Sequence, residues 1–451
     1  MFPAGVVVTE SALTDKYRFD RALDPAAGHP LAVVRAESTA DVQQAMRWAS
    51  RHRVPVVPRG AGSGLSGGST AVDGGIVLCT ERMTDIRVDP VTRMAVAQPG
   101  AFNAQVKAAA AAEGLWYPPD PSSWEICSIG GNVATNAGGL CCLKYGVTSD
   151  YVLGMQVVLS DGTAVRLGGP LLKDVAGLSL TKLFVGSEGT LGIVTEVTLR
   201  LLPAPPAPST LVATFASTAD AIDAVLAITG SLRPAMLEYM DSAAINAVED
   251  LLHMGLDRTA AALVVARSDG HPQDSQREIA VMSEACQRHD ALDVLSTDDE
   301  AEGEAFLVAR RMAIPAVERR GTLLLEDVGV PLPRLRDLVL GVETIAAQHD
   351  LTIAMIAHAG DGNTHPLIVF DPNDVAMTAH AEQAFGEIMD LAIRLGGTIT
   401  GEHGVGRLKK AWLPDQVGQE VMQLAHRIKV ALDPLGILNP GAVFGQDAAT
   451  G

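Results

Sequence analysis

The sequence is poor in the residues that define several classes of protein. Its five cysteines are an odd number without paired spacing, so they build neither a disulfide framework nor a zinc ribbon. Lysine and arginine (34) are outnumbered by aspartate and glutamate (53). The resulting formal charge of −19 disfavours binding to nucleic acid, which depends on neutralising phosphates. No apolar run approaches the roughly 20 residues of a transmembrane helix, and residues 152–159 are among the most apolar.

The N-terminus also lacks a basic segment followed by a hydrophobic stretch, so no secretory signal is visible and we expect a cytoplasmic protein. What the chain does have is a packed enzyme's composition, with 47% hydrophobic and 19% charged residues. Its 451 residues are too many for one compact core and predict two or three domains. The cysteines, including the adjacent Cys141 and Cys142, are expected to be reduced and structural.

Periodicity in the first half predicts short strands alternating with amphipathic helices. We expect helices at 40–52 and 103–113, strands at 54–57, 75–78 and 94–97, and a hairpin of 154–159 and 163–167 around Asp161-Gly162. Four prolines within residues 203–208 predict a stiff linker. Beyond it, strands at 211–215 and 260–266, with helices at 219–229 and 243–253, predict a separate α+β sandwich, and 421–432 a final helix.

Glycine-rich loops are the first sign of a ligand. Residues 58–69 hold five glycines within nine positions and can form a nest of amides around an anion. The pattern GxGxxG is present at 62–67, but the loop does not open a helix as a Rossmann loop would, and by itself it is also consistent with a flexible turn. Three further polar or glycine-rich clusters, at 118–122, 129–139 and 185–195, favour a large polar ligand such as a dinucleotide.

Two histidine motifs predict a metal site. His358 and His365 lie seven positions apart around an Asp-Gly turn, so their imidazoles can converge. A third ligand could come from residues 401–406, and two histidines with one carboxylate bind Zn²⁺, Mn²⁺ or Fe²⁺ while leaving positions open. The alternative is that these histidines are only hydrogen-bonded in loops that shape the cofactor site.

A pair of arginines stands in an apolar stretch at 309–316. A guanidinium binds a carboxylate with two parallel hydrogen bonds, which would supply local positive charge in an acidic protein. The alternative is a solvated helix face.

Together, the segments 58–69, 130–139 and 186–193 resemble the FAD domain of the vanillyl-alcohol oxidase superfamily. More narrowly, they are similar to its FAD-linked 2-hydroxy-acid dehydrogenases and oxidases, such as glycolate oxidase and D-lactate dehydrogenase. The resemblance covers residues 25–444 and implies an α+β fold: a two-subdomain FAD-binding domain of the PCMH type at 1–203, an α+β cap or substrate domain at 204–420, and a segment at 421–451 that returns to the FAD domain. One departure is Gly177-Leu178-Ser179-Leu180, where the family usually has Gly-Tyr-Asp-Leu.

The resemblance also implies which residues contact FAD, bound without a covalent link. They are Pro58, Arg59, Gly60, Ala61, Gly62, Ser63, Gly64, Leu65, Ser69, Pro119, Asp120, Pro121, Ser122, Gly130, Gly131, Asn132, Thr135, Asn136, Gly138, Gly139, Tyr145, Gly146, Glu188, Gly189, Gly192, Ile193, Val194 and Asn439.

For the chemistry, the resemblance implies His358, His365 and Glu402 as ligands of a divalent metal, most readily Zn²⁺ or Mn²⁺, and His403 as the catalytic base. Arg310 is implied as the clamp for the substrate carboxylate, with Asn363 and less directly Lys409 adding hydrogen bonds. The metal lowers the pKa of the substrate hydroxyl, a neutral imidazole accepts its proton, and hydride passes to FAD.

The expected substrate is a small D-2-hydroxy acid of the D-lactate or glycolate type. Relatives that act on 2-hydroxyglutarate place a lysine where this chain has Leu325, and the neighbouring Glu326 and Asp327 would repel a second carboxylate. The electron acceptor is expected among quinones, electron-carrier proteins and oxygen, and the assembly is expected to be a homodimer. Two alternatives stay open: a metal-free flavin oxidase or dehydrogenase of another alcohol, and a non-catalytic flavin subunit of a complex.

Overall fold

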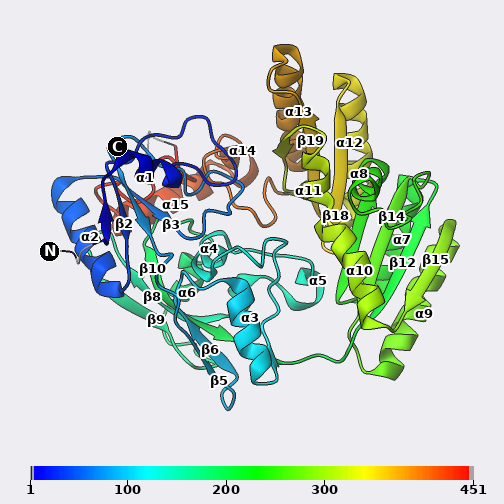
Figure 1. Cartoon of the computed structure of the whole chain (residues 1–451), viewed down its shortest axis with the longest axis horizontal. Coiled ribbons are helices and arrows are strands. Elements are labelled where there is room, and N and C mark those ends of the chain that lie inside the picture. The colour runs from blue at the N-terminus through cyan, green and yellow to red at the C-terminus, as the bar shows by residue number, and fades with distance from the viewer. Residues whose placement is uncertain (1, 3–4, 446–451) are drawn as a thin grey trace. The chain divides into compact units, whose positions relative to one another are not determined.

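The computed structural model describes Phe2 and residues 5–445, and its chain divides into two compact units (Figure 1). The first unit contains Met1–Gly138, Gly146–Ala204 and Glu402–Gly451, and the second contains Gly139–Tyr145 and Pro205–Gly401. The predicted boundary at 203 lies beside this division. The predicted boundary at 420 does not, because the chain leaves the second unit after Gly401, and the amides of Arg407 and Leu408 then bond to the carbonyl of Ser66 in the first unit.

The first unit is built on two sheets. One has the strand order β1-β2-β4-β3, the other β5-β6-β10-β8-β9, and β7 and β11 form a separate pair. The strands are β1 Val7–Val8, β2 Ala32–Arg35, β3 Val56–Arg59, β4 Ile76–Cys79, β5 Ile86–Asp89, β6 Met94–Ala97, β7 Leu115–Trp116, β8 Val152–Val158, β9 Ala164–Gly168, β10 Ile193–Arg200 and β11 Leu202–Pro203. The predicted strands and the hairpin are confirmed within two residues.

The helices of the first unit are α1 Ser11–Thr14, α2 Thr39–His52, α3 Asn103–Ala112, α4 Ile129–Thr135, α6 Leu180–Phe184, α14 Leu413–Val417 and α15 Gln419–Leu432. Helix α2 joins the two sheets into one core. Its apolar stripe, Val42, Ala45, Met46 and Ala49, packs in one cluster with residues of both sheets, among them Val34 and Val158. The two-subdomain arrangement is therefore confirmed.

One prediction needs correction. We expected residues 129–139 to expose their backbone as a loop, but the first part is helix α4. The Ser128 side chain accepts a hydrogen bond from Gly131, which caps the helix, and Ile129 and Val133 are four positions apart and both buried. The helix ends at Asn136, whose φ is +55°, so only the residues after it form a loop.

The linker between the units contains the predicted prolines. Pro203 lies in β11, a two-residue strand that pairs only with β7, where a missing amide costs little, and residues 204–208 have no regular structure. None of the helices in the described part of the chain is both long enough and apolar enough to cross a lipid bilayer. The cytoplasmic location stays a prediction.

The second unit is an antiparallel sheet with helices on both faces, the predicted α+β sandwich. Its strand order is β15-β12-β14-β13-β18-β19-β16, with β17 also paired to β19. The strands are β12 Ser209–Phe215, β13 Met236–Asp241, β14 Ala262–Ser268, β15 Ala291–Thr297, β16 Thr322–Leu325, β17 Val328–Gly329, β18 Thr352–His358 and β19 Asn363–Phe370. The helices are α5 Cys142–Tyr145, α7 Thr218–Ser231, α8 Ser242–Leu252, α9 Pro272–Arg288, α10 Glu300–Arg311, α11 Ala313–Glu318, α12 Leu335–His349 and α13 Val375–Arg394.

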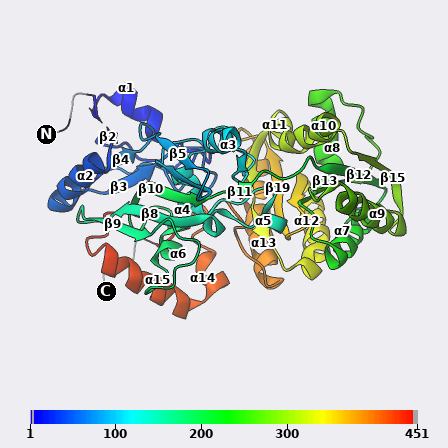
Figure 2. The ribbon, with the colours of Figure 1, turned by 90° about the horizontal axis from the view of Figure 1, so that it is seen from below.

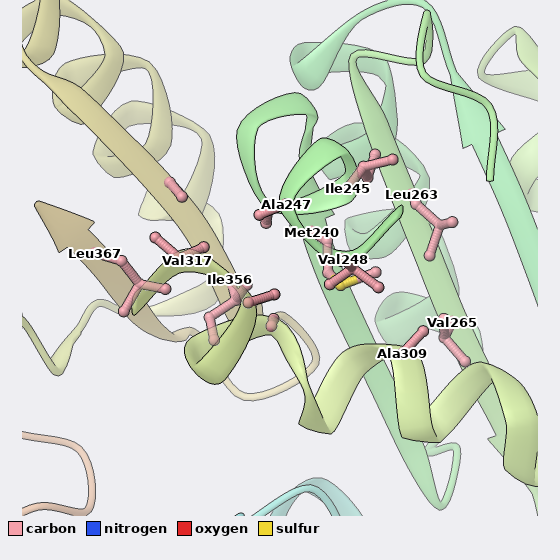
Figure 3. Close-up of a cluster of buried hydrophobic side chains, with 14 of the residues drawn as sticks. Met240, Ile245, Ala247, Val248, Leu263, Val265, Ala309, Val317, Ile356 and Leu367 are labelled. Carbon is pink, nitrogen blue, oxygen red and sulfur yellow. The ribbon is translucent and has the colours of Figure 1, made fainter. Parts of the chain in front are cut away.

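Alternation along the strands decides which residues meet which helices. Helices α8, α10 and α11 cover one face of the sheet, and α7, α9 and α12 cover the other (Figure 2). On the first face, Met236 and Met240 of β13, Ile356 of β18 and Leu367 of β19 belong to one apolar cluster with residues of α8, α10 and α11 (Figure 3). This face also carries the polar residues described below.

Candidate functional site

A run of backbone amides without partners follows β3 in the first unit. Within the described part of the chain, no hydrogen bond engages the N–H groups of Gly62, Ser63, Gly64 and Leu65, and these residues are partly exposed. Consecutive amides of this kind form a site for an anion such as a pyrophosphate. The loop opens no helix, as predicted, so the residues present fit a dinucleotide held by backbone amides rather than by a Rossmann helix.

Not every glycine around this loop is needed for a ligand. A Cβ added to Gly60 would lie 2.3 Å from Oγ of Ser128, and one added to Gly130 would lie 2.6 Å from Pro99. The same holds for Gly189 beside Pro58, at 2.8 Å. These glycines let segments of the chain pack against each other, and they give the cradle its shape indirectly.

Arg59, which ends β3, is turned into the protein. Its Nη1 donates to the carbonyl of Phe19 at 2.7 Å, and its guanidinium lies 5.8 Å from the ring centroid of Tyr17. Burial lowers the pKa of Arg59 from its usual value. The guanidinium therefore supplies positive charge beneath the amide cradle while holding the N-terminal segment in place.

The carboxylate of Glu188, a residue predicted to contact the cofactor, accepts hydrogen bonds from two backbone amides of the protein. Oε1 accepts the amide of Val405 and Oε2 the amide of Gly406, both at 2.8 Å. Burial raises the pKa of Glu188 to about 7, although the two amides act in the opposite direction. Asn439 behaves similarly, because its side-chain amide donates to the carbonyls of Gly68 and Glu188 at 2.8 and 2.7 Å. Both side chains brace the loops, and their contact with a cofactor stays a prediction.

The hydrogen bonds of Glu188 to Val405 and Gly406 hold the segment that carries His403. The Ser66 hydroxyl donates to the carbonyl of His403 at 3.1 Å, and Nε2 of His403 lies 3.7 Å from Oε1 of its neighbour Glu402. A Cβ on Gly406 would lie 2.0 Å from the carbonyl oxygen of Ser66, so only glycine permits this close approach. The predicted base is thus fixed at its backbone by the glycine-rich loop.

The other predicted cofactor residues are distributed over four segments. Pro119–Ser122 precede α4, and Asn132 and Thr135 lie in α4. Gly138 and Gly146 flank the insertion into the second unit, Gly192 precedes β10, and Ile193 and Val194 begin that strand. Gly139 and Tyr145 belong to the second unit, where the Tyr145 hydroxyl and the Lys144 ammonium both contact Asp269.

In the second unit, the two predicted histidines share one face of the sheet. Strand β18 pairs with β19 so that Ile356 lies opposite His365 and His358 lies opposite Asn363. His358 is two residues from Ile356, so period-two alternation puts His358 and His365 on the same face. Their ring centroids are 5.2 Å apart and both side chains are buried. The two rings therefore lie close together, as the turn allows, and their role as metal ligands stays a prediction.

The hydrogen bonds of the two rings select one tautomer each. Nδ1 of His358 lies 2.9 and 3.0 Å from the two carboxylate oxygens of Glu238. Nδ1 of His365 lies 3.3 Å from the carbonyl of Glu326. Because both partners are acceptors, each neutral ring carries its proton on Nδ1 and its lone pair on Nε2. That is the form in which a histidine binds a metal while an outer partner orients it.

The paired arginines have different surroundings. Arg310 is only 2% exposed, its Nε lies 2.9 Å from Oε2 of Glu238, and its Nη2 is buried with no hydrogen-bond partner among the described residues. Arg311 is partly exposed and pairs with Glu304 at 3.3 Å. The solvated-face interpretation fits Arg311, whereas Arg310 has an unused donor inside the protein.

Asn363, at the start of β19, lies opposite His358 in the sheet. Its Oδ1 is buried without a partner among the described residues, and a Cβ on Gly401 would lie 2.3 Å from it. Gly401 is fixed there because its amide donates to the carbonyl and to Oδ2 of Asp327, at 3.2 and 3.0 Å. Glu402 is the next residue, so its Cα lies about 3.8 Å from the Cα of Gly401.

The sequence did not predict the positioning roles of three residues around the site: Glu238, Ser66 and Asp327, the last of which was named only as a charge opposing a second carboxylate. Glu238 did leave a signal, since it is a single acid inside the otherwise apolar run Met236–Met240 of a strand that is buried throughout. A buried acid requires a partner. Its partners, His358 and Arg310, are too distant in sequence for the pattern to identify them.

Comparisons with known proteins identify the family of the chain. Residues 30–168 match the family model described as an FAD binding domain, and residues 204–443 match the C-terminal domain of FAD linked oxidases. The chain is 42% identical to the glycolate oxidase subunit GlcD of Bacillus subtilis over 93% of this chain and 90% of that protein. It is 33% identical to a D-lactate dehydrogenase of Archaeoglobus fulgidus, over 95% and 96% of the two chains.

Solved structures of other enzymes share the fold. p-Cresol methylhydroxylase with substrate bound superposes with a TM-score of 0.81 at 18% identity, covering 97% of this chain and 93% of that one. The 4-ethylphenol oxidase of Gulosibacter chungangensis gives 0.78 at 19% identity, covering 97% and 94%. At such identities these matches confirm the predicted fold alone, and the assignment of FAD binding rests on the family models.

Proposed function

Because the chain belongs to the family of FAD-linked oxidases, and is therefore an FAD-binding oxidoreductase, we propose that it oxidises a small D-2-hydroxy acid to the 2-oxo acid. The substrate is of the D-lactate or glycolate type. The names of the Bacillus and Archaeoglobus relatives support this class of substrate. The observation that carries the proposal is the buried Arg310, whose Nη2 has no partner in the described chain and which shares Glu238 with His358.

Each part of the reaction has a residue suited to it. Arg310 binds the substrate carboxylate, because a buried guanidinium with an unused donor gains most from an anion. Asn363 hydrogen-bonds the substrate through its side-chain amide. His403 accepts the hydroxyl proton, a role for which a neutral imidazole is suited at physiological pH. Bound FAD supplies the acceptor for the hydride from the substrate carbon.

The proposal includes a divalent metal, Zn²⁺ or Mn²⁺, held by His358, His365 and Glu402. These three buried residues form a group that could hold a metal ion, and two imidazoles with one carboxylate suit either metal. Support comes from the Nδ1 hydrogen bonds of both histidines and from the anchoring of Gly401, next to Glu402, on Asp327. When bound, the metal lowers the pKa of the substrate hydroxyl and so eases proton transfer to His403.

Selectivity for a substrate with one carboxylate is part of the proposal. Leu325, at the position where relatives for 2-hydroxyglutarate place a lysine, packs against the apolar cluster of the second unit, so its side chain offers no partner for an anion. Glu326 and Asp327, the next two residues, are fully buried acids that oppose a second carboxylate. The electron acceptor, which we place among quinones, carrier proteins and oxygen, and the homodimeric assembly stay predictions.

Anaerobic bleaching of the bound flavin tests this function. Purified protein with FAD is mixed with glycolate, D- and L-lactate, and D- and L-2-hydroxyglutarate. We expect D-lactate or glycolate to reduce the flavin fastest, and chelation of metal to slow the reduction until Mn²⁺ or Zn²⁺ is restored. Faster reduction by D-2-hydroxyglutarate contradicts the substrate assignment. Full activity after chelation contradicts the metal and supports the alternative of a metal-free flavin enzyme. A flavin that none of these acids reduces indicates a protein that acts only within a complex.

A further inference from the structure

We propose that Glu238 is a positioning residue that couples the metal-binding histidine to the carboxylate clamp. The inference rests on the proposed function, in which His358 holds the metal and Arg310 holds the substrate. Glu238 adds a residue to which neither the sequence motifs nor the comparisons assign a role. Its carboxylate contacts both side chains, His358 at 2.9 Å and Arg310 at 2.9 Å.

The sheet places Glu238 for this role. Strand β13 pairs with β18 so that Met240 lies opposite Ile356 and Tyr239 opposite Ala357. Continuing the register by one residue puts Glu238 opposite His358, and directly opposed residues point to the same face of a sheet. Arg310 reaches the same carboxylate from the last turn of α10, which covers that face. Three elements therefore bring one acid, one histidine and one arginine together.

The surroundings make this contact an unusual one. Two residues before Glu238 is Met236 and two residues after it is Met240, and both belong to the apolar cluster under α8, α10 and α11. Glu238 thus occupies a position that alternation would give to a hydrophobic side chain, and it is only 1% exposed. Burial of a carboxylate destabilises the folded state unless the group is paired and hydrogen-bonded. Glu238 can therefore occupy this position only with its two partners.

The shared carboxylate has a distinct effect on each partner. On His358 it accepts the Nδ1 proton, which keeps the lone pair on Nε2 and makes that nitrogen a better ligand. On Arg310 it balances the buried positive charge through an ion pair at Nε, while Nη2 has no hydrogen-bond partner among the described residues. Because both partners contact the same carboxylate, we infer that a change at Glu238 disturbs both of them.

The competing interpretation is that Glu238 only stabilises the fold as a buried ion pair. A structural residue would lower the melting temperature when replaced but would leave the affinity for metal and the KM for substrate unchanged. The decisive measurement is therefore metal binding to the substrate-free protein. Outer-shell carboxylates of this kind typically change metal affinity by about 10- to 100-fold.

The experiment compares three full-length proteins loaded with FAD: wild type, Glu238→Gln and Glu304→Gln. The control variant changes Glu304 of α10, the helix that also carries Arg310, and so removes a carboxylate from Arg267 and Arg311. Equilibrium dialysis with Mn²⁺ alone gives the dissociation constant of each. We expect Glu238→Gln to bind Mn²⁺ about 10- to 100-fold more weakly than wild type, and Glu304→Gln to match wild type. With substrate, Glu238→Gln should also raise KM.

Two outcomes overturn the inference in different ways. If wild type binds Mn²⁺ and Glu238→Gln binds it equally well, Glu238 is structural, and the proposed function is untouched. If wild type binds no metal, the metal part of the proposed function fails first and the coupling fails with it. Should Glu238→Gln not fold, Glu238→Asp replaces it, since the shorter carboxylate keeps the charge but cannot reach both partners, and wild-type affinity in that variant contradicts the coupling.

Discussion

Glu188 and Val405, 217 positions apart in the sequence, are joined by a hydrogen bond of 2.8 Å between the Glu188 carboxylate and the Val405 amide. The second oxygen of the same carboxylate holds Gly406. The backbone of the segment that carries His403 is therefore attached to the loop before β10. This attachment does not involve the side chain of His403. Only a carboxylate offers two acceptors in this position, which explains an acid at a buried site.

Replacement of Glu188 by alanine should strongly destabilise the protein. The change leaves the buried amides of Val405 and Gly406 without an acceptor, at about 1–3 kcal/mol each. We expect a clear drop in the melting temperature of the FAD-loaded protein, together with loss of activity because the His403 segment moves. The control is Glu196→Ala in β10, which removes only exposed pairs with Arg87 and Arg166 and should cost less than about 1 kcal/mol. Equal melting temperatures for the two variants would contradict this role of Glu188.

Substitution of Gly60 by alanine should weaken the retention of FAD. The new methyl would lie 2.3 Å from Oγ of Ser128, so the loop after β3 or the start of α4 must shift. We expect a lower ratio of flavin to protein absorbance in the purified variant. Gly169→Ala is the matched control, since no atom lies within 4 Å of its added Cβ.

A second substitution tests the stated cause. In Gly60→Ala with Ser128→Ala, the nearest atom to the new methyl becomes Cβ of residue 128 at 3.5 Å, an ordinary contact. Flavin content should recover in part. It should stay below the wild-type value because Ser128→Ala also removes the N-cap of α4. A double variant no better than Gly60→Ala would show that the collision with Ser128 is not what disturbs the site.

The sequence predicted most where the signal was local. The placement of His358 and His365 on one face of the sheet follows from a tight turn and from period-two alternation, both of which are visible within eight residues. The role of Glu238 could not be predicted, because its partner His358 is 120 positions away and the register of β13 on β18 is set by packing of the whole sheet. The same limit applies to the domain boundary after Gly401, which depends on a bond to Asp327.

Glycine patterns gave a mixed result for a physical reason. The loop at 60–69 is an amide cradle as predicted, but residues 129–135 form a helix although they contain two glycines. Gly130 is required there by Pro99, at 2.6 Å from an added Cβ, and not by an exposed backbone. From sequence alone, a glycine needed for internal packing cannot be distinguished from one needed for a ligand.

Stability should depend on pH through Asp241, the N-cap of α8. Burial raises the pKa of Asp241 from 3.8 to about 7 in the folded protein. The folded state therefore binds more protons than the unfolded state between pH 4 and 7, and the contribution of Asp241 to stability falls as pH rises through this window. Asp241→Asn keeps an acceptor for the amide of Ala244 but cannot ionise.

The measurement for Asp241 is the melting temperature of wild type and variant from pH 4.5 to 8. We expect the difference between them to shift in favour of Asp241→Asn as pH rises, and to level off above pH 7. Asp299→Asn, at the exposed N-cap of α10, should instead track the wild type across this range. Parallel curves for Asp241→Asn and wild type would mean that Asp241 does not take up a proton on folding.

The adjacent arginines allow the carboxylate clamp to be tested with a control one residue away. Arg310→Lys removes the planar fork that contacts Glu238 and that we propose binds the substrate carboxylate, whereas Arg311→Lys alters only a partly exposed pair with Glu304. A charge-assisted hydrogen bond contributes about 1.5–3 kcal/mol, which corresponds to a loss of roughly 10- to 150-fold in kcat/KM for Arg310→Lys. Most of the loss should appear in KM, at unchanged flavin content. Equal kcat/KM values in the two variants would show that Arg310 is held by Glu238 for the fold alone, and the substrate carboxylate would then need another partner.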